Sequence, residues 1–188
     1  MYLKFFKPLF DFFVALVMLL LISPILLILG IILSIHLTEH PIFLQERIGK
    51  DGKSFIIFKF KTISHLGYKT KLTEIFRKFK LDELPQLFNI LRGEMSVVGP
   101  RPDIPGYYDC LEGENRKILK LKPGLTGCAS LAYYNEEEIL ANVDDPKRYN
   151  DEVIFPKKIE LNLWYLNHIS FQLDLKLIFK TLFLPFSR

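Results

Sequence analysis

The chain has 188 residues, of which 49% are hydrophobic and 24% are charged. This length suits one domain of ordinary size with a real core and excludes two or more large domains, while 14% aromatic residues exclude an intrinsically disordered chain. A mean hydropathy of +0.19 is high for a soluble protein, and the apolar excess is concentrated near the N-terminus.

An apolar run without any charged side chain covers residues 12–35. As a helix with a rise of about 1.5 Å per residue it would extend roughly 36 Å, enough to cross a bilayer. No small-residue cleavage pattern follows the run, so we expect it to be retained rather than removed as a signal peptide. Ser23-Pro24 at its middle predicts a kink or a break, because Pro24 has no amide hydrogen for the carbonyl of Leu20. A kinked transmembrane helix and a re-entrant hairpin both fit this pattern.

Basic residues follow the apolar run. Residues 41–80 contain ten basic and three acidic side chains, whereas residues 81–188 contain thirteen and sixteen. The positive-inside rule places such a block in the cytoplasm. A basic block after a membrane segment suits lipid headgroups or a phosphorylated ligand, and the anchoring run argues against nucleic acid as a partner. Cys110 and Cys128 form no CxxC pair, which fits a reduced cytoplasmic setting.

A β-hairpin is predicted after the apolar run. Residues 42–45 and 55–60 are rich in β-branched and aromatic side chains, and they flank the turn sequence Gly-Lys-Asp-Gly at 49–52. Side chains alternate between the two faces of a strand, so Lys59 and Lys61 should lie on one face of the second arm. We therefore expect these two lysines to point together.

Helical periodicity dominates the rest of the chain. Residues 69–80 form a basic stretch with apolar side chains at helical spacing, and residues 84–91 carry an apolar stripe. Pro85 fits the first turn of that second helix. Two further apolar-rich stretches lie at 159–166 and 173–184, and the amphipathic pattern of the latter fits either the core or a membrane surface.

Asp82 and Glu83 are thereby placed at a helix N-terminus. One acidic residue there can simply be an N-cap. However, a helix N-terminus also attracts phosphate, Lys59 and Lys61 are expected to share a strand face, and two prolines hold Arg101 in a stiff loop. If these groups converge, they would surround one phosphoryl group. Such a site would need a metal, because carboxylate and phosphate repel each other and Mg²⁺ bridges them with oxygen ligands.

Residues 36–40, His-Leu-Thr-Glu-His, match the pattern of inverted zinc peptidases. We do not expect a zinc site, because the motif lies at the end of the apolar run, Pro41 follows at once and no third ligand is apparent. His65 and His168 are isolated in the sequence. No Walker loop, GxGxxG or GxSxG motif occurs.

Three segments carry a family resemblance: KFKTI at 59–63, LDELPQLFNILRGEMSVVGPRP at 81–102 and KPGLTG at 122–127. They closely resemble the bacterial sugar transferase family, the small monotopic phosphoglycosyl transferases, and the likeness covers nearly the whole chain. The resemblance implies an α+β, mainly helical fold. Residues 1–40 would form a re-entrant helix-break-helix membrane segment, and residues 41–188 a compact cytoplasmic catalytic domain with a small β-hairpin and interfacial amphipathic helices.

The resemblance also implies an activity, the transfer of a phosphosugar from a UDP-sugar to a polyprenyl phosphate such as undecaprenyl phosphate. By this analogy Asp82 is the nucleophile and forms a covalent phosphosugar intermediate, Glu83 is its partner and Mg²⁺ is the cofactor near Asp82. Ser23-Pro24 would turn the helix back so that both ends lie on the cytoplasmic face of the bacterial inner membrane. Membrane lipids and the later glycosyltransferases of a polysaccharide or glycoconjugate pathway would be further partners.

The chain departs from the family pattern after the Thr-Gly-x-Ala turn. Many members carry an Asn-Gly-Arg element there, whereas this chain reads GCASLAYYNEEEIL at 127–140, so the role of Ser130 to Glu138 in substrate recognition stays open. Two other functions fit the residues alone. A membrane phosphohydrolase would use water as the acceptor, and in a non-catalytic membrane scaffold Asp82 would only cap a helix.

Overall fold

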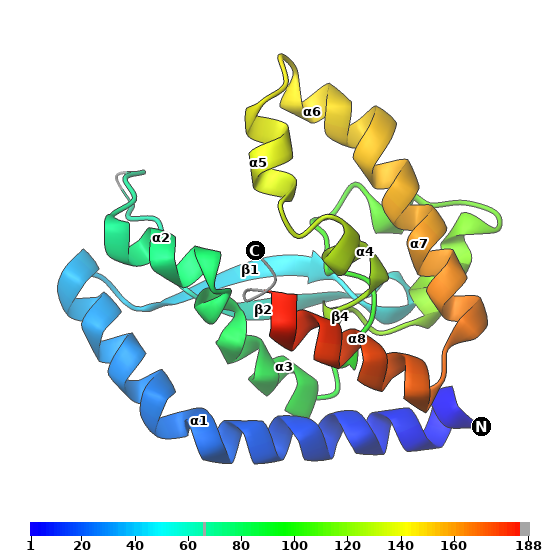
Figure 1. Ribbon diagram of the computed structural model, residues 1–188, viewed down its shortest axis with the longest axis horizontal. Helices are drawn as coiled ribbons and strands as arrows, with labels where there is room; N and C mark the ends of the chain where they lie inside the picture. The colour runs from blue at the N-terminus through cyan, green and yellow to red at the C-terminus, as the bar shows by residue number, and fades with distance from the viewer. Residues whose placement is uncertain (66, 185–188) are drawn as a thin grey trace.

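The computed structural model describes residues 1–65 and 67–184, and helices dominate it (Figure 1). Within these residues, β1 (Ile42–Ile48) pairs with β2 (Ser54–Phe60), and β3 (Ser96–Val98) pairs with β4 (Gly124–Thr126). The α-helices are α1 (Lys7–Leu37), α2 (Lys71–Lys78), α3 (Leu87–Leu91), α4 (Cys128–Ala132), α5 (Glu136–Ala141), α6 (Pro146–Tyr149), α7 (Phe155–His168) and α8 (Phe171–Phe183). Short 3-10 helices cover Lys50–Gly52, Leu81–Gln86, Tyr108–Cys110 and Asn115–Lys120, and π-helical turns cover Tyr2–Phe6 and Asn150–Ile154.

The apolar run forms one continuous helix with a bend. A π-helical turn leads into α1, which continues through Pro24 to Leu37 and bends near its middle (Figure 1). The Ser23 hydroxyl donates a hydrogen bond to the Leu20 carbonyl at 3.2 Å, the acceptor for which Pro24 has no amide hydrogen. The expected break is therefore a bend, and the two halves of α1 do not form a hairpin.

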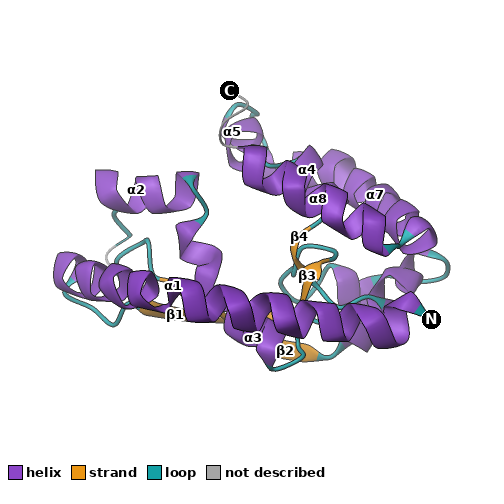
Figure 2. Ribbon diagram, turned by 60° about the horizontal axis from the view of Figure 1, so that its bottom comes forward, coloured by secondary structure: helices purple, strands orange, loops and turns teal. Residues whose placement is uncertain are grey.

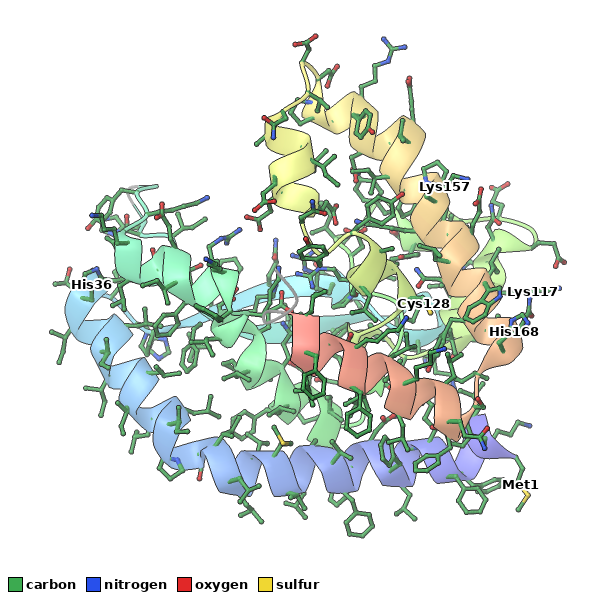
Figure 3. All side chains as sticks on the ribbon, in the orientation of Figure 1. Met1, His36, Lys117, Cys128, Lys157 and His168 are labelled. Atoms are coloured by element: carbon green, nitrogen blue, oxygen red, sulfur yellow. The ribbon has the colours of Figure 1, made fainter. Side chains whose placement is uncertain are left out.

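The rest of the protein packs along one face of α1, before and after the bend. Lys7, Asp11, Ala15 and Leu19 recur at four-residue spacing and are buried, and Leu33 and Leu37 are buried beyond the bend. In the described part of the chain, this helix is the one long and apolar enough to cross a membrane. Side chains on its outer side project away from the molecule between the labelled ends Met1 and His36 (Figure 3). The exposed apolar residues of α1 include Leu9, Phe12, Phe13, Val17, Leu20, Leu21, Ile25, Leu27, Ile28, Ile31 and Ile35.

The hairpin prediction is confirmed. β1 and β2 are antiparallel, with Ile42 opposite Phe60 and Ile48 opposite Ser54. The turn between them depends on left-handed backbone, with φ of 60° at Asp51 and 77° at Gly52. Because β2 ends at Phe60, the expected strand alternation stops before Lys61.

A second, parallel pair of strands holds the loop that carries Arg101. The Gly99 amide donates to the Thr126 carbonyl at 2.8 Å, and the Gly124 amide donates to the Pro100 carbonyl at 2.7 Å. A Cβ atom on Gly99 would lie 2.3 Å from the Lys122 carbonyl oxygen, so only glycine permits this approach of the two backbones. Three residues per strand are too few to show an alternating pattern, so this sheet cannot be predicted from the local sequence.

One core joins α1 to the rest of the chain. Ala15 of α1 packs in the same cluster as Ile57 of β2, Leu87 of α3, Val98 of β3 and Tyr165 of α7. The expected boundary near residue 40 lies between α1 and β1, and α1 is continuous in packing with the body that follows it. Figure 2 shows α1 lying lengthwise across α3 and β2.

The stretch at 173–184 lies in α8, and its apolar side chains divide between two faces. Leu177 is buried in the core, and Ile178 packs against the core cluster. In contrast, Phe179 and Leu182 are 57% and 58% exposed. The helix thus fits both of the placements that the sequence left open, with one face in the core and one apolar face free.

Candidate active site

The carboxyl groups of Asp82 and Glu83 lie in the 3-10 helix Leu81–Gln86, directly before α3. Lys80 precedes them with a left-handed backbone, φ 55°, which turns the chain sharply after α2. Both residues are buried. No side-chain hydrogen bond caps this helix, so Asp82 does not fill the structural role of an N-cap that its position in the sequence allowed.

Glu83 is fully engaged by cations. The Arg101 guanidinium donates two hydrogen bonds to its carboxylate, at 2.5 Å to Oε1 and 3.3 Å to Oε2. The Lys59 ammonium lies 3.5 Å from the same Oε1. Burial opposes ionisation of this carboxyl, but the charges of Arg101 and Lys59 outweigh it and lower the pKa of Glu83 to about 2. Glu83 is therefore a fixed anion that holds two cations in place.

Asp82 has the opposite surroundings. Its Oδ1 atom is buried and has no hydrogen-bond partner. Burial first, and the neighbouring Glu83 charge second, raise the pKa of Asp82, while Lys59, Arg77 and Lys80 act in the other direction. A desolvated carboxylate without hydrogen bonds is a stronger nucleophile than one bound by donors, and it is also a free ligand for a cation.

Arg101 is positioned as the sequence predicted. The strands β3 and β4 fix its loop, and Pro100 and Pro102 restrict the backbone on either side. Its side chain is 36% exposed while its guanidinium grips Glu83. The same planar group can therefore also face a ligand, and guanidinium suits phosphate oxygens.

Lys61 is placed elsewhere. Its ammonium lies 2.9 Å from Oε2 of Glu39, and the backbone amide and ring Nδ1 of His65 contact Oε1 of the same carboxylate at 2.9 and 2.6 Å. The ammonium groups of Lys59 and Lys61 are thus bound to two different carboxylates, and the expectation that both would serve one site is not met. The structure brings Asp82, Glu83, Lys59 and Arg101 together and leaves Lys61 in an ion pair just beyond the end of α1.

Sequence reasoning missed a cation and an anion near the site. Arg77 of α2 is close enough to affect the pKa of Asp82, and its guanidinium forms an ion pair with Glu137 of α5. Figure 1 shows α2 and α5 as separate arms of the molecule, which this pair connects. Arg77 could have been suspected from the basic stretch just before Asp82. Glu137 could not, because it is 60 positions away in the chain.

The open segment Ser130 to Glu138 covers the end of α4 and the start of α5. Glu136 pairs with the largely buried Lys158 of α7 at 2.6 Å. Together with the pair between Glu137 and Arg77, this places the acidic start of α5 beside the candidate site. The segment is thus attached to both α7 and α2.

The residues present fit a single divalent cation that is shared with a ligand. Among the described residues, no group of three or more His, Cys, Asp or Glu side chains could hold a metal alone. Mg²⁺ is commonly held by one or two carboxylates together with water and substrate phosphates. Asp82 offers a buried oxygen without a partner, whereas both oxygens of Glu83 accept hydrogen bonds from Arg101.

The site combines two buried carboxyl groups with cations of the kind that bind phosphate oxygens. Comparison with known sequences gives the family. The chain belongs to the bacterial sugar transferase family, whose model matches residues 2–188. The resemblance of the quoted segments is thereby confirmed.

Relatives of this chain include proteins with named substrates. A UDP-glucose:undecaprenyl-phosphate glucose-1-phosphate transferase of Klebsiella pneumoniae is 35% identical, with 96% of this chain and 40% of the relative aligned. A UDP-N-acetylgalactosamine-undecaprenyl-phosphate N-acetylgalactosaminephosphotransferase of Aeromonas hydrophila is 29% identical, with 92% and 41% aligned. This chain therefore spans about 40% of the length of these two relatives. It matches 83% of the uncharacterized sugar transferase EpsL of Bacillus subtilis (strain 168), which is 32% identical.

Proposed function

We propose that this protein transfers a phosphosugar from a UDP-sugar to a polyprenyl phosphate, such as undecaprenyl phosphate, and releases UMP. The observation that carries the proposal is the contrast between the two neighbouring carboxyl groups. Glu83 is bound by Arg101 and Lys59, while Asp82 is buried with an oxygen that has no partner. Glu83 would thus hold the two cations in place, and Asp82 would be free to react. The named activities of the relatives from K. pneumoniae and A. hydrophila support the same chemistry.

The reaction would proceed in two displacements at one phosphorus atom. First, a carboxylate oxygen of Asp82 bonds to the β-phosphorus of the UDP-sugar, and the bond from that phosphorus to the bridging oxygen breaks, so that UMP leaves with the electron pair. Next, an oxygen of the polyprenyl phosphate bonds to the same phosphorus. The bond to Asp82 breaks, which restores the carboxylate and yields the polyprenyl diphosphosugar. Covalent catalysis of this kind divides one difficult transfer into two easier steps.

The surrounding cations supply fixed positive charge. Lys59 and Arg101 are held against Glu83 before any substrate arrives, so little reorganisation is needed when charge develops on the phosphoryl oxygens. Arg77 and Lys80 add positive charge near Asp82. Mg²⁺ bound at Asp82 would neutralise charge between that carboxylate and the diphosphate of the donor. The product would then serve the later glycosyltransferases of a polysaccharide or glycoconjugate pathway.

We further propose that α1 enters one leaflet and returns to the cytoplasmic face of the bacterial inner membrane. The support is the packing of α1, which buries Lys7 near its start and Leu37 at its end against the same body. A helix that crossed the bilayer would carry these contacts to opposite sides of the membrane. The exposed apolar side chains of its outer face would meet lipid, as would the free apolar face of α8.

One assay tests the activity. UMP release from a panel of UDP-sugars is measured with Mg²⁺, with and without undecaprenyl phosphate, for the native protein and for Asp82→Asn. We expect sustained release by the native protein only when the lipid is present, and none from the variant. Sustained release without lipid would instead indicate a phosphohydrolase. Full turnover by Asp82→Asn would refute the nucleophile assignment, and no release by the native protein with any UDP-sugar would favour the scaffold.

A further inference from the structure

An asparagine side chain connects the helix after the candidate site to the free edge of β2. The Phe58 amide donates a hydrogen bond to Oδ1 of Asn89 at 3.0 Å, and Nδ2 of Asn89 donates to the Ile56 carbonyl at 2.7 Å. β1 occupies the opposite edge of β2. The side-chain amide of Asn89 therefore takes the place that a third strand would occupy on this edge.

Both polar atoms of this amide are engaged, the oxygen by one donor and the nitrogen by two acceptors. Asn89 is 0% exposed, and its Nδ2 also donates to Oε2 of Glu94 at 2.8 Å. The orientation of the amide follows from its partners, because a backbone N–H can only donate and a backbone carbonyl can only accept. Leucine has a similar size but no polar atoms, and aspartate would place a second carboxylate against Glu94. Asparagine is thus the side chain that these three partners select.

We call these hydrogen bonds of Asn89 the clasp. It connects two elements, β2 and the helical segment before α3's end, that each contribute residues to the site. Lys59 directly follows Phe58 on β2, and Glu83 lies six positions before Asn89 in the continuous helical segment from Leu81 to Leu91. The ion pair between Lys59 Nζ and Glu83 Oε1 spans the same two elements at 3.5 Å. We propose that Asn89 is a positioning residue for the transfer reaction, and that it fixes β2 against the helical segment so that Lys59 stays beside Glu83 and Asp82.

This inference rests on the proposed function for its kinetic consequence, although the clasp itself can be measured without activity. A small displacement of catalytic groups by a distant mutation can reduce a rate about 100-fold. We therefore expect Asn89→Leu to lower kcat for UMP release by roughly 10- to 100-fold, with a much smaller change in KM for the UDP-sugar. Exchange of the Phe58 amide hydrogen should become faster, because its acceptor is lost.

A matched control is available in α7. Asn162 is 1% exposed, and its Nδ2 donates to the Tyr108 hydroxyl at 2.9 Å. Asn162→Leu removes another buried asparagine, whose hydrogen bond to a tyrosine hydroxyl lies outside the site, so it should lower the melting temperature and leave kcat per folded molecule near the native value.

A second pair of variants keeps the proposal testable if Asn89→Leu fails to fold. Asn89→Asp should also be slow, and adding Glu94→Gln should restore part of kcat, since the amide can donate to the new carboxylate.

The experiment compares kcat, KM and exchange of the Phe58 amide for these variants in the full-length protein, with rates normalised to the folded fraction. The proposal is upheld when Asn89→Leu loses kcat and Phe58 protection and Asn89→Asp loses kcat, while Asn162→Leu keeps both kcat and Phe58 protection. It is overturned when Asn89→Leu and Asn162→Leu lose kcat equally, or when Phe58 stays protected in Asn89→Leu. Absence of UMP release by the native protein would refute the transfer function, and the exchange measurement would then still decide whether the clasp exists.

Discussion

Two adjacent carboxyl groups have different surroundings, and the roles proposed for them follow from that difference. Asp82 and Glu83 are consecutive in a 3-10 helix, yet Arg101 and Lys59 form ion pairs only with Glu83. A fixed anion keeps the two cations in place, and these cations make the region favourable for a phosphorylated substrate. Asp82 retains a buried oxygen without a hydrogen-bond partner, as the proposed nucleophile requires. Their surroundings differ because consecutive side chains of a helical turn point to different sides.

At the scale of residues, motif and spacing predicted that Asp82 and Glu83 lie near Lys59 and Arg101. They did not predict the ion pair of Lys61. Alternation describes directions only inside a strand, and β2 stops at Phe60. The ammonium of Lys61 instead forms an ion pair with the half-buried carboxylate of Glu39. Nothing in the local sequence marks that pairing, because the two residues are 22 positions apart and belong to different elements.

Lys59 and Lys61 form a natural matched pair for mutation. Lys59→Ala should lower kcat/KM by roughly 30- to 1,000-fold, the effect of about 2–4 kcal/mol expected when one preorganised donor is lost from a reaction centre. Lys61→Ala should keep activity close to the native value, because its ammonium is bound to Glu39. Steady-state assays of both variants decide the matter. An equal loss in Lys61→Ala would place that lysine at the site, as strand alternation had predicted.

At the scale of elements, a buried network fastens the start of α1 to α8. Asp174 of α8 is completely buried and accepts hydrogen bonds from the Tyr2 hydroxyl and the Lys7 ammonium, both at 2.6 Å, and from the Tyr165 hydroxyl. Lys7 also lies 3.8 Å from Asp11 of α1. The ammonium of Lys7 is thus the cation that balances two buried carboxylates. Sequence patterns could not reveal this, because Lys7 and Asp174 are 167 positions apart.

Removing that cation should destabilise the protein strongly. Lys7→Met keeps the length and most of the apolar stem but leaves Asp11 and Asp174 buried without a counter-charge. Breaking one partner of a buried ion pair costs about 3–5 kcal/mol. For a protein of this size we expect the melting temperature in detergent to fall by roughly 6–20 °C. Lys4→Met removes an exposed lysine from the preceding π-helical turn and serves as the control. Equal melting of both variants would show that the network contributes little.

A second set of contacts, between Glu39, Lys61 and His65, lies just beyond the C-terminal end of α1. Its contribution to stability should depend on pH. Lys61 and the backbone and ring of His65 lower the pKa of Glu39 to about 2, below its ordinary value of 4.5. Because the folded-state pKa is lower than the unfolded one, the stabilisation is present above about pH 4.5 and is lost as the pH falls towards 2. The difference in unfolding free energy between the native protein and Glu39→Gln should therefore be larger at pH 7 than at pH 3. A difference that is constant over this range would contradict the assignment.

At the scale of the whole molecule, composition predicted an apolar membrane helix and left its path open. A spanning helix and a re-entrant one have the same hydropathy and the same flanking charges, so tertiary packing has to distinguish them. The contacts of Lys7 and Leu37 with one body favour the re-entrant path. The hairpin and the dyad were predictable because their signals are local. The β3–β4 sheet was not, because each strand has three residues and its partner lies far along the chain.

The re-entrant path predicts where the N-terminus lies. In a background in which Cys110 and Cys128 are replaced by serine and alanine, Lys4→Cys should resist a membrane-impermeant maleimide on intact cells and react after permeabilisation. Lys157→Cys, on the exposed side of α7, should behave in the same way and is the control for the cytoplasmic body. Labelling of the Lys4→Cys variant on intact cells, with Lys157→Cys still protected, would show that α1 crosses the membrane.

The central claim is that Asp82 itself carries the phosphosugar between donor and acceptor. The most direct measurement is the intact mass of the purified protein after rapid quenching of a mixture with Mg²⁺ and its UDP-sugar, without lipid. The native protein should gain the mass of one phosphosugar, lose it when undecaprenyl phosphate is added, and show no gain as Asp82→Asn. Turnover to polyprenyl diphosphosugar without any such adduct, or an adduct that persists in Asp82→Asn, would contradict the account.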